Sequence, residues 1–421
     1  MSAENGGTIH IGPGKLDGVV RAPASKSFAH RALICSALAV AEGGQITQLT
    51  RVTMSKDIAA TLDCLEALGF RLEVEGENIK VMGYEDRTGD EVIHLNCGES
   101  GSTLRFMIPL AAALGRTTVF TGEGRLPSRP IGEYNSIFHH KGVHVEATDG
   151  MLPLKIEGQL QSGVFHVSGN ISSQYITGLL LALPLLEGDS EVRLLTPLES
   201  APYIDITIDV LKAFGVSVEK LGDEGFAVKG GQKYVARDYE IEGDYSQAAF
   251  WLTANYLGSN VEIEGLNPSS SQGDKAISEA LIQMGFGPER TIDVAQIPDL
   301  VPILAAGSAL TPGVTHIINA GRLRIKESDR LAAVTEVLTK IGADIKEFPD
   351  KLVITGKDSL RGGHVHAWND HRIAMMLAIV ALRTKNGVTV DGFHCIEKSY
   401  PEFFNEFARL GGEVNELNLG K

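Results

Sequence analysis

The chain has 421 residues, of which 43% are hydrophobic and 22% are charged, and its formal net charge at pH 7 is −15. This length allows two or three domains with substantial cores. The acidic balance argues against a broad nucleic-acid-binding surface, which needs an excess of Lys and Arg. Any anion-binding site must therefore be a local concentration of positive charge.

The 4 cysteines show neither a CxxC pair nor metal-ligand spacing, so reduced thiols and no metal site are expected. The N-terminus has no basic region followed by an apolar run, which argues against a signal peptide. The longest apolar stretch, "YITGLLLALPLL", is too short to span a bilayer. We therefore expect a cytoplasmic protein that binds neither membrane nor nucleic acid.

Six segments begin with polar residues and turn strongly apolar, which predicts six buried helices. In chain order they start near residues 23, 99, 172, 244, 297 and 369. Each is followed by an amphipathic helix that ends in Gly before a strand-like alternation. These glycines are Gly69, Gly142, Gly215, Gly285, Gly342 and Gly411. Glycine at such a position indicates a left-handed C′ residue.

The repeat of about 70 residues predicts an α/β protein built from six βαβαββ units, each with an inner and an outer helix. Three units make one domain, so a boundary is expected near residue 242. A strand at about residues 8 to 20 precedes the first inner helix. The periodicity leaves open whether that strand belongs to the later half.

Polar and cationic groups gather where the inner helices begin. They are Lys26, Ser27 and Arg31; Gly101, Ser102 and Arg105; Ser172, Ser173 and Gln174; Asp299; and His371 and Arg372. Helix N-termini present free N–H groups and the positive end of the helix dipole, so cations there imply an anion between them. Each Ser taken alone is better explained as an N-cap, but capping does not explain Lys26, Arg31 and Arg372.

Two further segments are rich in charge. "GRLPSRPIGEY" carries Arg125 and Arg129 in a loop, and "GRLRIKESDRLAAV" is expected at the start of an outer helix. In the second, Glu327 and Arg330 could be an ordinary i,i+3 pair. "CIEKSYPEFF" places Lys398 just before a helix that a proline would start.

These motifs resemble one family over nearly the whole chain. "SKSFAHRA", "GESGSTLRF", "RPIGEY", "ISSQYITGLLLALP", "IPDLVP", "RIKESDRL", "NDHRIAM" and "EKSYPEFF" occur in the order and spacing of the 3-phosphoshikimate 1-carboxyvinyltransferase (EPSP synthase) family. The resemblance implies the two-domain enolpyruvyl transferase fold, with three βαβαββ units per domain. It also implies that residues 1–22 and 243–421 form one domain and residues 23–242 the other, with the active site in the cleft between them.

The resemblance implies transfer of the enolpyruvyl group of phosphoenolpyruvate to the 5-hydroxyl of shikimate 3-phosphate, by addition and elimination of phosphate, without metal or organic cofactor. Asp299, Glu327 and Lys26 would be catalytic. Shikimate 3-phosphate would be bound by Lys26, Ser27, Arg31, Ser172, Ser173, Gln174, Ser200, Asp299 and Lys326, with Tyr203 as a further candidate. Phosphoenolpyruvate would be bound by Lys26, Gly101, Arg129, Arg330, Arg372 and Lys398. A monomer that closes around its substrates is the implied state.

Some positions depart from the common family pattern. They are Ala24, His30, Glu99, Ser102, Ala201 and Arg322; at position 30 the family usually has Asn. Gly101 leaves room beside the implied phosphoenolpyruvate site, so we expect sensitivity to glyphosate, the family inhibitor.

Two alternatives stay open. A UDP-N-acetylglucosamine enolpyruvyl transferase would share the fold and chemistry, but that family has a "KN" pair in its first helix and a Cys in its mobile loop. Here the first helix reads "SKS", and residues 121–132 contain no Cys. An inactive binding module of the same fold is the other alternative, and the presence of Asp299, Glu327, Lys26 and Lys398 argues against it.

Overall fold

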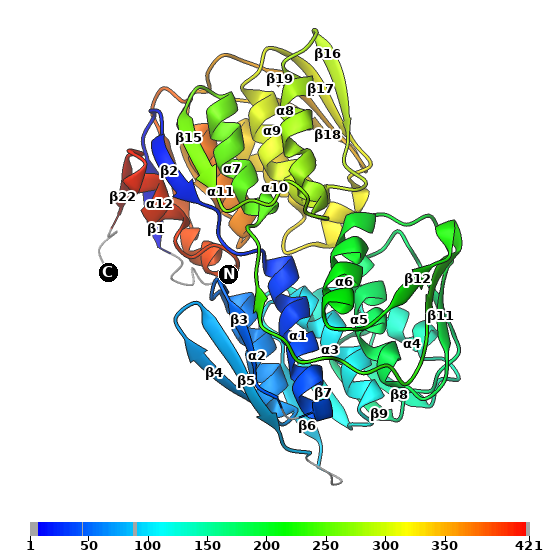
Figure 1. Ribbon diagram of the computed structural model, residues 1–421. Coiled ribbons are helices and arrows are strands. Elements are labelled where there is room, and N and C mark those ends of the chain that lie inside the picture. The colour runs from blue at the N-terminus through cyan, green and yellow to red at the C-terminus, as the bar shows by residue number, and fades with distance from the viewer. Residues whose placement is uncertain (1–6, 44, 87–90, 418–421) are drawn as a thin grey trace. The chain divides into compact units, whose positions relative to one another are not determined.

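The computed structural model describes residues 7–43, 45–86 and 91–417, and the chain folds into two compact units (Figure 1). One unit is Ala24–Glu242, and the other combines Met1–Pro23 with Gly243–Lys421. Each unit has its own hydrophobic core.

The unit Ala24–Glu242 contains three repeats. The helices are α1 (Lys26–Gly43), α2 (Lys56–Ala67), α3 (Gly101–Ala113), α4 (Glu133–Ile137), α5 (Ser173–Ala182) and α6 (Ala201–Ala213). The strands are β3 (Thr47–Thr50), β4 (Phe70–Glu75), β5 (Asn78–Tyr84), β6 (Ile93–Asn96), β7 (Thr118–Thr121), β8 (Val143–Thr148), β9 (Met151–Gly158), β10 (Val164–Val167), β11 (Ser190–Leu194), β12 (Val218–Lys220), β13 (Gly225–Val228) and β14 (Tyr239–Glu240).

Each repeat of this unit forms a four-stranded sheet with one pattern of pairing. The strand orders are β14-β3-β5-β4, β6-β7-β9-β8 and β10-β11-β13-β12. In each sheet the first two strands are parallel and the remaining pairs are antiparallel. The inner helices α1 and α3 both contact α5, so the three helices share one core.

The other unit also contains three repeats. Its helices are α7 (Tyr245–Tyr256), α8 (Ile277–Met284), α9 (Val301–Ala309), α10 (Arg330–Lys340), α11 (His371–Ala381) and α12 (Phe403–Arg409). Its strands are β1 (Thr8–Ile11), β2 (Asp17–Arg21), β15 (Asn260–Glu264), β16 (Glu289–Asp293), β17 (Gly313–Ile318), β18 (Asp344–Glu347), β19 (Leu352–Gly356), β20 (Gly363–His366), β21 (Val388–Asp391) and β22 (Val414–Glu416). The inner helices α7, α9 and α11 contact one another.

The first strands of the chain pair with strands from its second half. β1 lies between β21 and β22, antiparallel to both, and β2 pairs with β15 in parallel. These hydrogen-bonded ladders are why residues before Pro23 belong to the same unit as residues after Glu242.

The fourth repeat is smaller than the others. Its sheet contains only β15 and β2 among the described residues, and β16 of the next repeat follows α8 within a few residues. A missing strand pair explains why Gly285 and Gly342 are closer in sequence than the other glycines of the series. The α/β prediction with six repeated units is confirmed, with this one unit reduced.

The predicted left-handed glycines occur in five of the six places. Gly69, Gly142, Gly215, Gly342 and Gly411 have φ between 77° and 105°. The prediction is wrong for the glycine that follows α8, residue 285, which keeps a right-handed φ of −75°. There the left-handed residue comes two positions later, at a second glycine with φ 74°.

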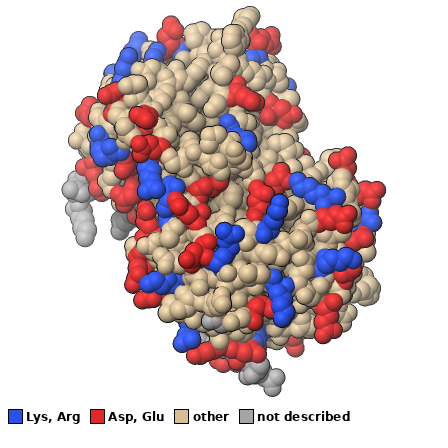
Figure 2. Space-filling model, in the orientation of Figure 1, with Lys and Arg blue, Asp and Glu red and all other residues tan. Residues whose placement is uncertain are grey.

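The inner helices are apolar on nearly every face because they are enclosed by their own units. All residues of α9 and α11 are buried. On the face shown in Figure 2, Lys and Arg alternate with Asp and Glu, without a continuous basic area. The buried cations Arg31, Arg105, Arg330 and Arg372 instead lie near the starts of helices.

Candidate active site

Two inner helices of the unit Ala24–Glu242 begin with polar side chains in contact with one another. Ser100 caps α3 by accepting a hydrogen bond from the Thr103 N–H at 3.2 Å, and Ser172 caps α5 through the Gln174 N–H at 3.3 Å. The Gln174 amide donates to the Ser102 hydroxyl at 2.9 Å, so the first turns of α5 and α3 touch. Free N–H groups at such ends attract anions.

Lys26 is the first residue of α1, and its ammonium is paired. Its Nζ lies 2.5 Å from Oδ2 of Asp57, in the first turn of α2, and the Lys26 side chain is 20% exposed. The pair fixes the direction of the lysine while part of the side chain stays accessible. Sequence reasoning missed Asp57, because an acidic residue just after the N-cap Ser55 is what any helix start favours.

Arg31 is buried one turn into α1. Its Nε donates to Thr207 at 2.8 Å, Nη1 to the Ser27 carbonyl at 2.7 Å, and Nη2 to Thr177 at 3.2 Å and to the Tyr203 carbonyl at 3.1 Å. Burial lowers the pKa of the guanidinium to about 9, so the group stays charged at neutral pH. Arg31 therefore ties α1 to α5 and α6.

Gly101 is the first residue of α3, and two guanidinium groups approach it closely. A Cβ at this position would lie 2.7 Å from Arg129 Nη1 and 2.9 Å from Arg105 Nη1. Arg129 is buried just after a short 3-10 helix (Leu126–Ser128). Only glycine leaves both cations where they are.

The remaining predicted residues of this unit also gather near the helix ends. Gln174 accepts a hydrogen bond from Arg105 Nη1 at 3.2 Å, and Ser173 is buried. Ser200 precedes α6 and has a left-handed φ of 57°. A left-handed serine is uncommon and strained, and such strain often accompanies a binding site.

Asp299 is the centre of the cluster in the other unit. It lies in a 3-10 turn (Pro298–Leu300) just before α9. Its Oδ1 accepts a hydrogen bond from Arg330 Nη1 at 2.9 Å and lies 3.9 Å from Lys326 Nζ, while its Oδ2 accepts from Arg372 Nη2 at 3.0 Å. Burial alone would raise the pKa of this carboxyl, but Arg372, Lys326 and Arg330 hold it well below its usual range.

Arg330 begins α10 and bonds three carboxylates. Besides Asp299, it donates from Nη2 to Glu327 Oε2 at 2.7 Å and from Nε to Asp370 Oδ2 at 2.9 Å. Burial would lower the pKa of Arg330, yet the carboxylates of Asp370, Glu327 and Asp299 raise it above its ordinary value. The guanidinium is therefore permanently charged and fixed in orientation.

Asp370 was not predicted as a site residue, although it lies in the "NDHR" motif. It caps α11 by accepting from the Arg372 N–H at 3.0 Å, and it also accepts from the Ser328 hydroxyl at 2.9 Å. It thus orients both Arg330 and Arg372. An Asp before a helix reads as an N-cap, which hides its second role.

Two of the predicted site residues in this unit are lysines. Burial lowers the pKa of Lys326 to about 8, against the opposing effect of Asp299 and Glu327. Lys398 is buried at the end of a 3-10 helix (Phe393–Lys398), and its Nζ donates to the Asn369 carbonyl at 2.8 Å. The helix predicted to start at the following proline begins at Phe403 instead.

The segment "RIKESDRL" differs from the prediction of a helix start. A 3-10 turn (Gly321–Ile325) ends before Lys326, and α10 begins only at Arg330, because Asp329 acts as its N-cap and accepts from the Ala332 N–H at 3.1 Å. Lys326 and Glu327 therefore precede the helix. This loop conformation lets both side chains face the Asp299 cluster.

A further buried acid, Asp274, carries no signal in the sequence. It lies on a 3-10 helix (Gly273–Ala276) that contacts α7. Burial, reinforced by the nearby Asp299, raises the pKa of Asp274 to about 7, although Arg372 opposes the shift. The Asp274 carboxyl is therefore about half protonated near neutral pH, while Asp299 stays ionised.

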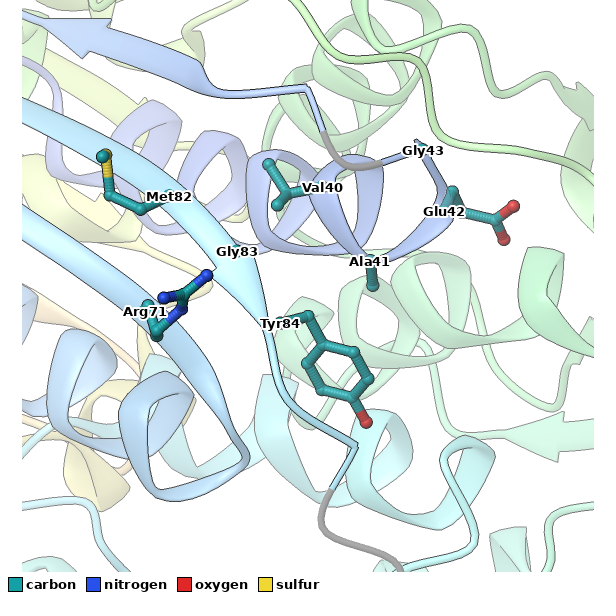
Figure 3. A pocket seen from close by; sticks show the side chains of 8 residues that line it. All are labelled: Val40, Ala41, Glu42, Gly43, Arg71, Met82, Gly83 and Tyr84. Carbon is teal, nitrogen blue, oxygen red and sulfur yellow. The ribbon is translucent and has the colours of Figure 1, made fainter.

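Within residues 7–43, 45–86 and 91–417, no group of three His, Cys, Asp or Glu side chains could hold a metal ion, and no helix is long and apolar enough to cross a membrane. An open pocket of about 470 Å³ lies at the C-terminal end of α1, lined by Val40, Glu42, Arg71, Met82 and Tyr84 among others (Figure 3). None of the predicted site residues lines it.

Comparisons with known proteins identify the family of this chain. The family model described as EPSP synthase (3-phosphoshikimate 1-carboxyvinyltransferase) matches residues 11–407. A Clostridium kluyveri protein named 3-phosphoshikimate 1-carboxyvinyltransferase is 46% identical, with 98% of this chain and 99% of that protein covered. A Clostridium acetobutylicum protein of the same name is 44% identical at the same coverage.

Solved structures show the same fold. EPSP synthase from Acinetobacter baumannii superposes with a TM-score of 0.78 at 26% identity, covering 97% of this chain and 100% of the other. The enolpyruvyl transferase NikO from Streptomyces tendae gives 0.77 at 18% identity, covering 97% of this chain and 98% of that one, and this likeness concerns the fold. The architecture is thus the enolpyruvyl transferase fold. The chain belongs to the EPSP synthase (3-phosphoshikimate 1-carboxyvinyltransferase) family.

Proposed function

We propose that this chain transfers the enolpyruvyl group of phosphoenolpyruvate to the 5-hydroxyl of shikimate 3-phosphate, which releases phosphate. The family match and the names of the relatives support the reaction. It belongs to the shikimate pathway of aromatic amino-acid biosynthesis. The observation that carries the chemical argument is the Asp299 carboxylate, which three cations hold in its ionised form.

Shikimate 3-phosphate is bound mainly by the unit Ala24–Glu242 in this proposal. The residues are Lys26, Ser27, Arg31, Ser172, Ser173, Gln174 and Ser200, with Asp299 and Lys326 contributed by the other unit. Serine hydroxyls and N–H groups at the starts of α1 and α5 suit a phosphate. Arg31 contributes its charge and holds α5 and α6 in place, since its guanidinium bonds Thr207 and Thr177.

Phosphoenolpyruvate is bound by Lys26, Gly101, Arg129, Arg330, Arg372 and Lys398. Two pairs of features suit its two anionic groups. Arg330 and Arg372 are rigid and charged, which favours bidentate recognition of a carboxylate or phosphate. Arg129 next to the side-chain-free Gly101 offers a cation beside an open position. These cations would also stabilise phosphate as it leaves.

The reaction is an addition followed by an elimination. The 5-hydroxyl oxygen forms a bond to C2 of phosphoenolpyruvate while C3 takes a proton; the resulting tetrahedral adduct then loses phosphate from C2 as C3 returns a proton. Asp299 accepts the hydroxyl proton, and Glu327 donates a proton to C3. Lys26 assists as a third catalytic group. A base works best when its pKa is near the working pH, and Asp299 in the described state is more acidic than that.

Substrate binding removes this difficulty. When an anion pairs with Arg330 and Arg372, their attraction for the Asp299 carboxylate is partly neutralised. Opposite charges lower a carboxyl pKa, so neutralising them raises it. The substrate thus makes Asp299 a stronger base only once it is bound.

Two alternatives are less well supported. A nucleotide-sugar acceptor has no support from the relatives, which are named for shikimate phosphate. An inactive binding module would not need Asp299, Glu327 and buried cations around one carboxylate. Phosphate release from phosphoenolpyruvate, measured with shikimate 3-phosphate and in parallel with UDP-N-acetylglucosamine, separates all three. The proposal expects release with the first acceptor only.

Some further properties remain predictions. They are a monomeric, cytoplasmic enzyme, an active site in the cleft between the domains, and closure of that cleft when both substrates bind. Closure would follow because each anion reduces repulsion among the cations. Small-angle scattering that shows no compaction with both substrates present would reject closure.

A further inference from the structure

A chain of buried hydrogen bonds connects α1, α2 and the start of α3. His30 Nδ1 lies 2.7 Å from the Thr61 hydroxyl, Thr61 lies 2.7 Å from the Thr103 hydroxyl, and Thr103 donates to Ser100 Oγ at 2.7 Å. All four side chains are at most 1% exposed. Ser100 is the N-cap of α3, so the chain ends beside Gly101.

One set of directions connects all four groups: His30 Nδ1–H donates to Thr61, Thr61 donates to Thr103, and Thr103 donates to Ser100. The bond between the two threonines can run either way, and the role of His30 Nδ1 depends on the tautomer of the ring. Burial, with the charges of Lys26 and Arg31 nearby, lowers the pKa of His30 well below its ordinary value, so the ring is neutral. Among the described residues Nε2 has no hydrogen-bond partner, and the ring packs edge-on to Phe106. In the tautomer with the proton on Nδ1, Nε2 carries no proton and so needs no hydrogen-bond acceptor.

The same chain includes the partner of Lys26. The carbonyl oxygen of Asp57 lies 3.4 Å from the Thr61 hydroxyl and 3.3 Å from the Thr103 hydroxyl, while its carboxylate pairs with Lys26 at 2.5 Å. The positions of Lys26 and of the first turn of α3 are therefore set by one connected group of atoms. Such networks fix geometry more strongly than isolated pairs.

We propose that His30 is a positioning residue for phosphoenolpyruvate, which acts through Thr61 and Thr103 on the first turn of α3. This inference rests on the proposed function, because that function assigns Gly101, Arg129 and Lys26 to this substrate. The chain fixes the start of α3 and so the close approach of Arg129 to Gly101, where an added Cβ would lie 2.7 Å from Arg129 Nη1. Without the chain, the first turn of α3 is held less firmly, and the contact between Arg129 and the bound anion weakens.

The geometry also tells which substitutions should matter. The amide nitrogen of an asparagine at position 30 can occupy the place of His30 Nδ1 and donate to Thr61, whereas a leucine of similar bulk cannot. The matching change at Thr61 is to valine, which keeps the shape and deletes the hydroxyl. Thr47 offers a control, because it is fully buried in the same unit and its hydroxyl has no hydrogen-bond partner among the described residues.

The first experiment is steady-state kinetics with both substrates varied. His30→Leu and Thr61→Val should each raise the KM for phosphoenolpyruvate by about tenfold, the scale of one lost buried hydrogen bond, with a change of less than about twofold in kcat. His30→Asn should stay within about twofold of wild type, and so should Thr47→Val. The double variant His30→Leu/Thr61→Val should be no worse than the worse single variant, since both break one chain. Equal loss in His30→Leu and His30→Asn, or additive effects, would overturn the inference.

A second measurement does not depend on activity. Hydrogen–deuterium exchange of the peptide that contains residues 101–105 should be faster in His30→Leu than in wild type and unchanged in His30→Asn. If the wild type shows no phosphate release with shikimate 3-phosphate, the proposed function fails, and unchanged exchange in His30→Leu would then refute the hydrogen-bond chain separately. If the wild type is active but the KM for phosphoenolpyruvate is unaffected in His30→Leu, only the present inference fails.

Discussion

Arg330 Nη1 lies 2.9 Å from Asp299 Oδ1, and the Arg330 side chain is only 1% exposed. The Arg330 guanidinium also bonds Glu327 and Asp370, so these bonds hold it in one orientation toward Asp299. The Asp299 carboxylate is therefore fixed from one side by Arg330 and from the other by Arg372. Three predictions concern this cluster, and one concerns the start of α3.

Asp299→Asn should abolish most of the activity without a large change in fold. The amide keeps the shape of the carboxylate but cannot accept a proton, and it leaves the cations around it without their counter-charge. Loss of a general base lowers kcat by about 10²- to 10⁴-fold. Stopped assays of phosphate release would measure this, with Asp344→Asn, an exposed residue of β18, as control. Retention of more than about a tenth of the wild-type kcat would remove Asp299 from the catalytic role.

Lys326 should set an alkaline limit on activity. Its pKa of about 8 means that the free enzyme loses this charge as the pH rises through 8, so kcat/KM for shikimate 3-phosphate should fall there. In Lys326→Arg the guanidinium stays charged, and the fall should move to higher pH. Profiles between about pH 6 and 9.5 would test this, and Lys340→Arg, which changes an exposed lysine, should leave the limit in place. An unshifted limit in Lys326→Arg would contradict the assignment.

Asp274→Asn should stabilise the protein more at pH 8 than at pH 5. The pKa of this carboxyl is raised to about 7 in the folded state, so the folded protein binds the extra proton between the unfolded pKa near 4 and pH 7. Stability therefore falls as the pH rises through that window and levels off above it. Asparagine does not titrate. Between pH 5 and pH 8, the free energy of unfolding of the variant should therefore rise relative to that of the wild type by on the order of 1 kcal/mol or more. Denaturant melts at several pH values would show this; a difference that is independent of pH would contradict it.

Gly101→Ala should weaken the binding of both phosphoenolpyruvate and glyphosate. The added Cβ would come within 3.0 Å of Arg129 and Arg105, and the flexible end of Arg129 would move away from the anion. We expect the KM for phosphoenolpyruvate to rise by about tenfold, since one charge-assisted hydrogen bond contributes roughly 1.5–3 kcal/mol. Gly14→Ala is a suitable control, because a Cβ there meets nothing within 4 Å. A glyphosate inhibition curve no better for wild type than for Gly101→Ala would show that the inhibitor binds elsewhere.

Local signals in the sequence were enough for the inner helices. The change from polar to apolar residues occurs within a few positions, and helices begin at Lys26, Gly101, Ser173, Tyr245, Val301 and His371, close to the expected starts. The reduced fourth repeat was harder to see, because a missing strand pair leaves no motif and shows only as a shorter spacing. The start of α10 was misplaced because Asp329 could be a helical residue or a cap, and only its bond to the Ala332 N–H decides.

The site was harder to predict where one residue has two roles. Asp57 and Asp370 each look like ordinary residues of a helix start, and each in fact pairs with a cation 31 or 40 positions away. A short segment of sequence does not predict contacts between residues so far apart in the chain. The buried environment that raises the pKa of Asp274 is likewise invisible before the chain is folded.

We expect the enolpyruvyl group to be transferred to shikimate 3-phosphate by addition and elimination. Running the reaction in D₂O and analysing the product by mass spectrometry tests this expectation most directly. The expected product has the mass of shikimate 3-phosphate that carries the enolpyruvyl group, with deuterium in the vinyl CH₂, because C3 gains and loses a proton during turnover. Phosphate release with a product free of deuterium, or with pyruvate as the only carbon product, would contradict it.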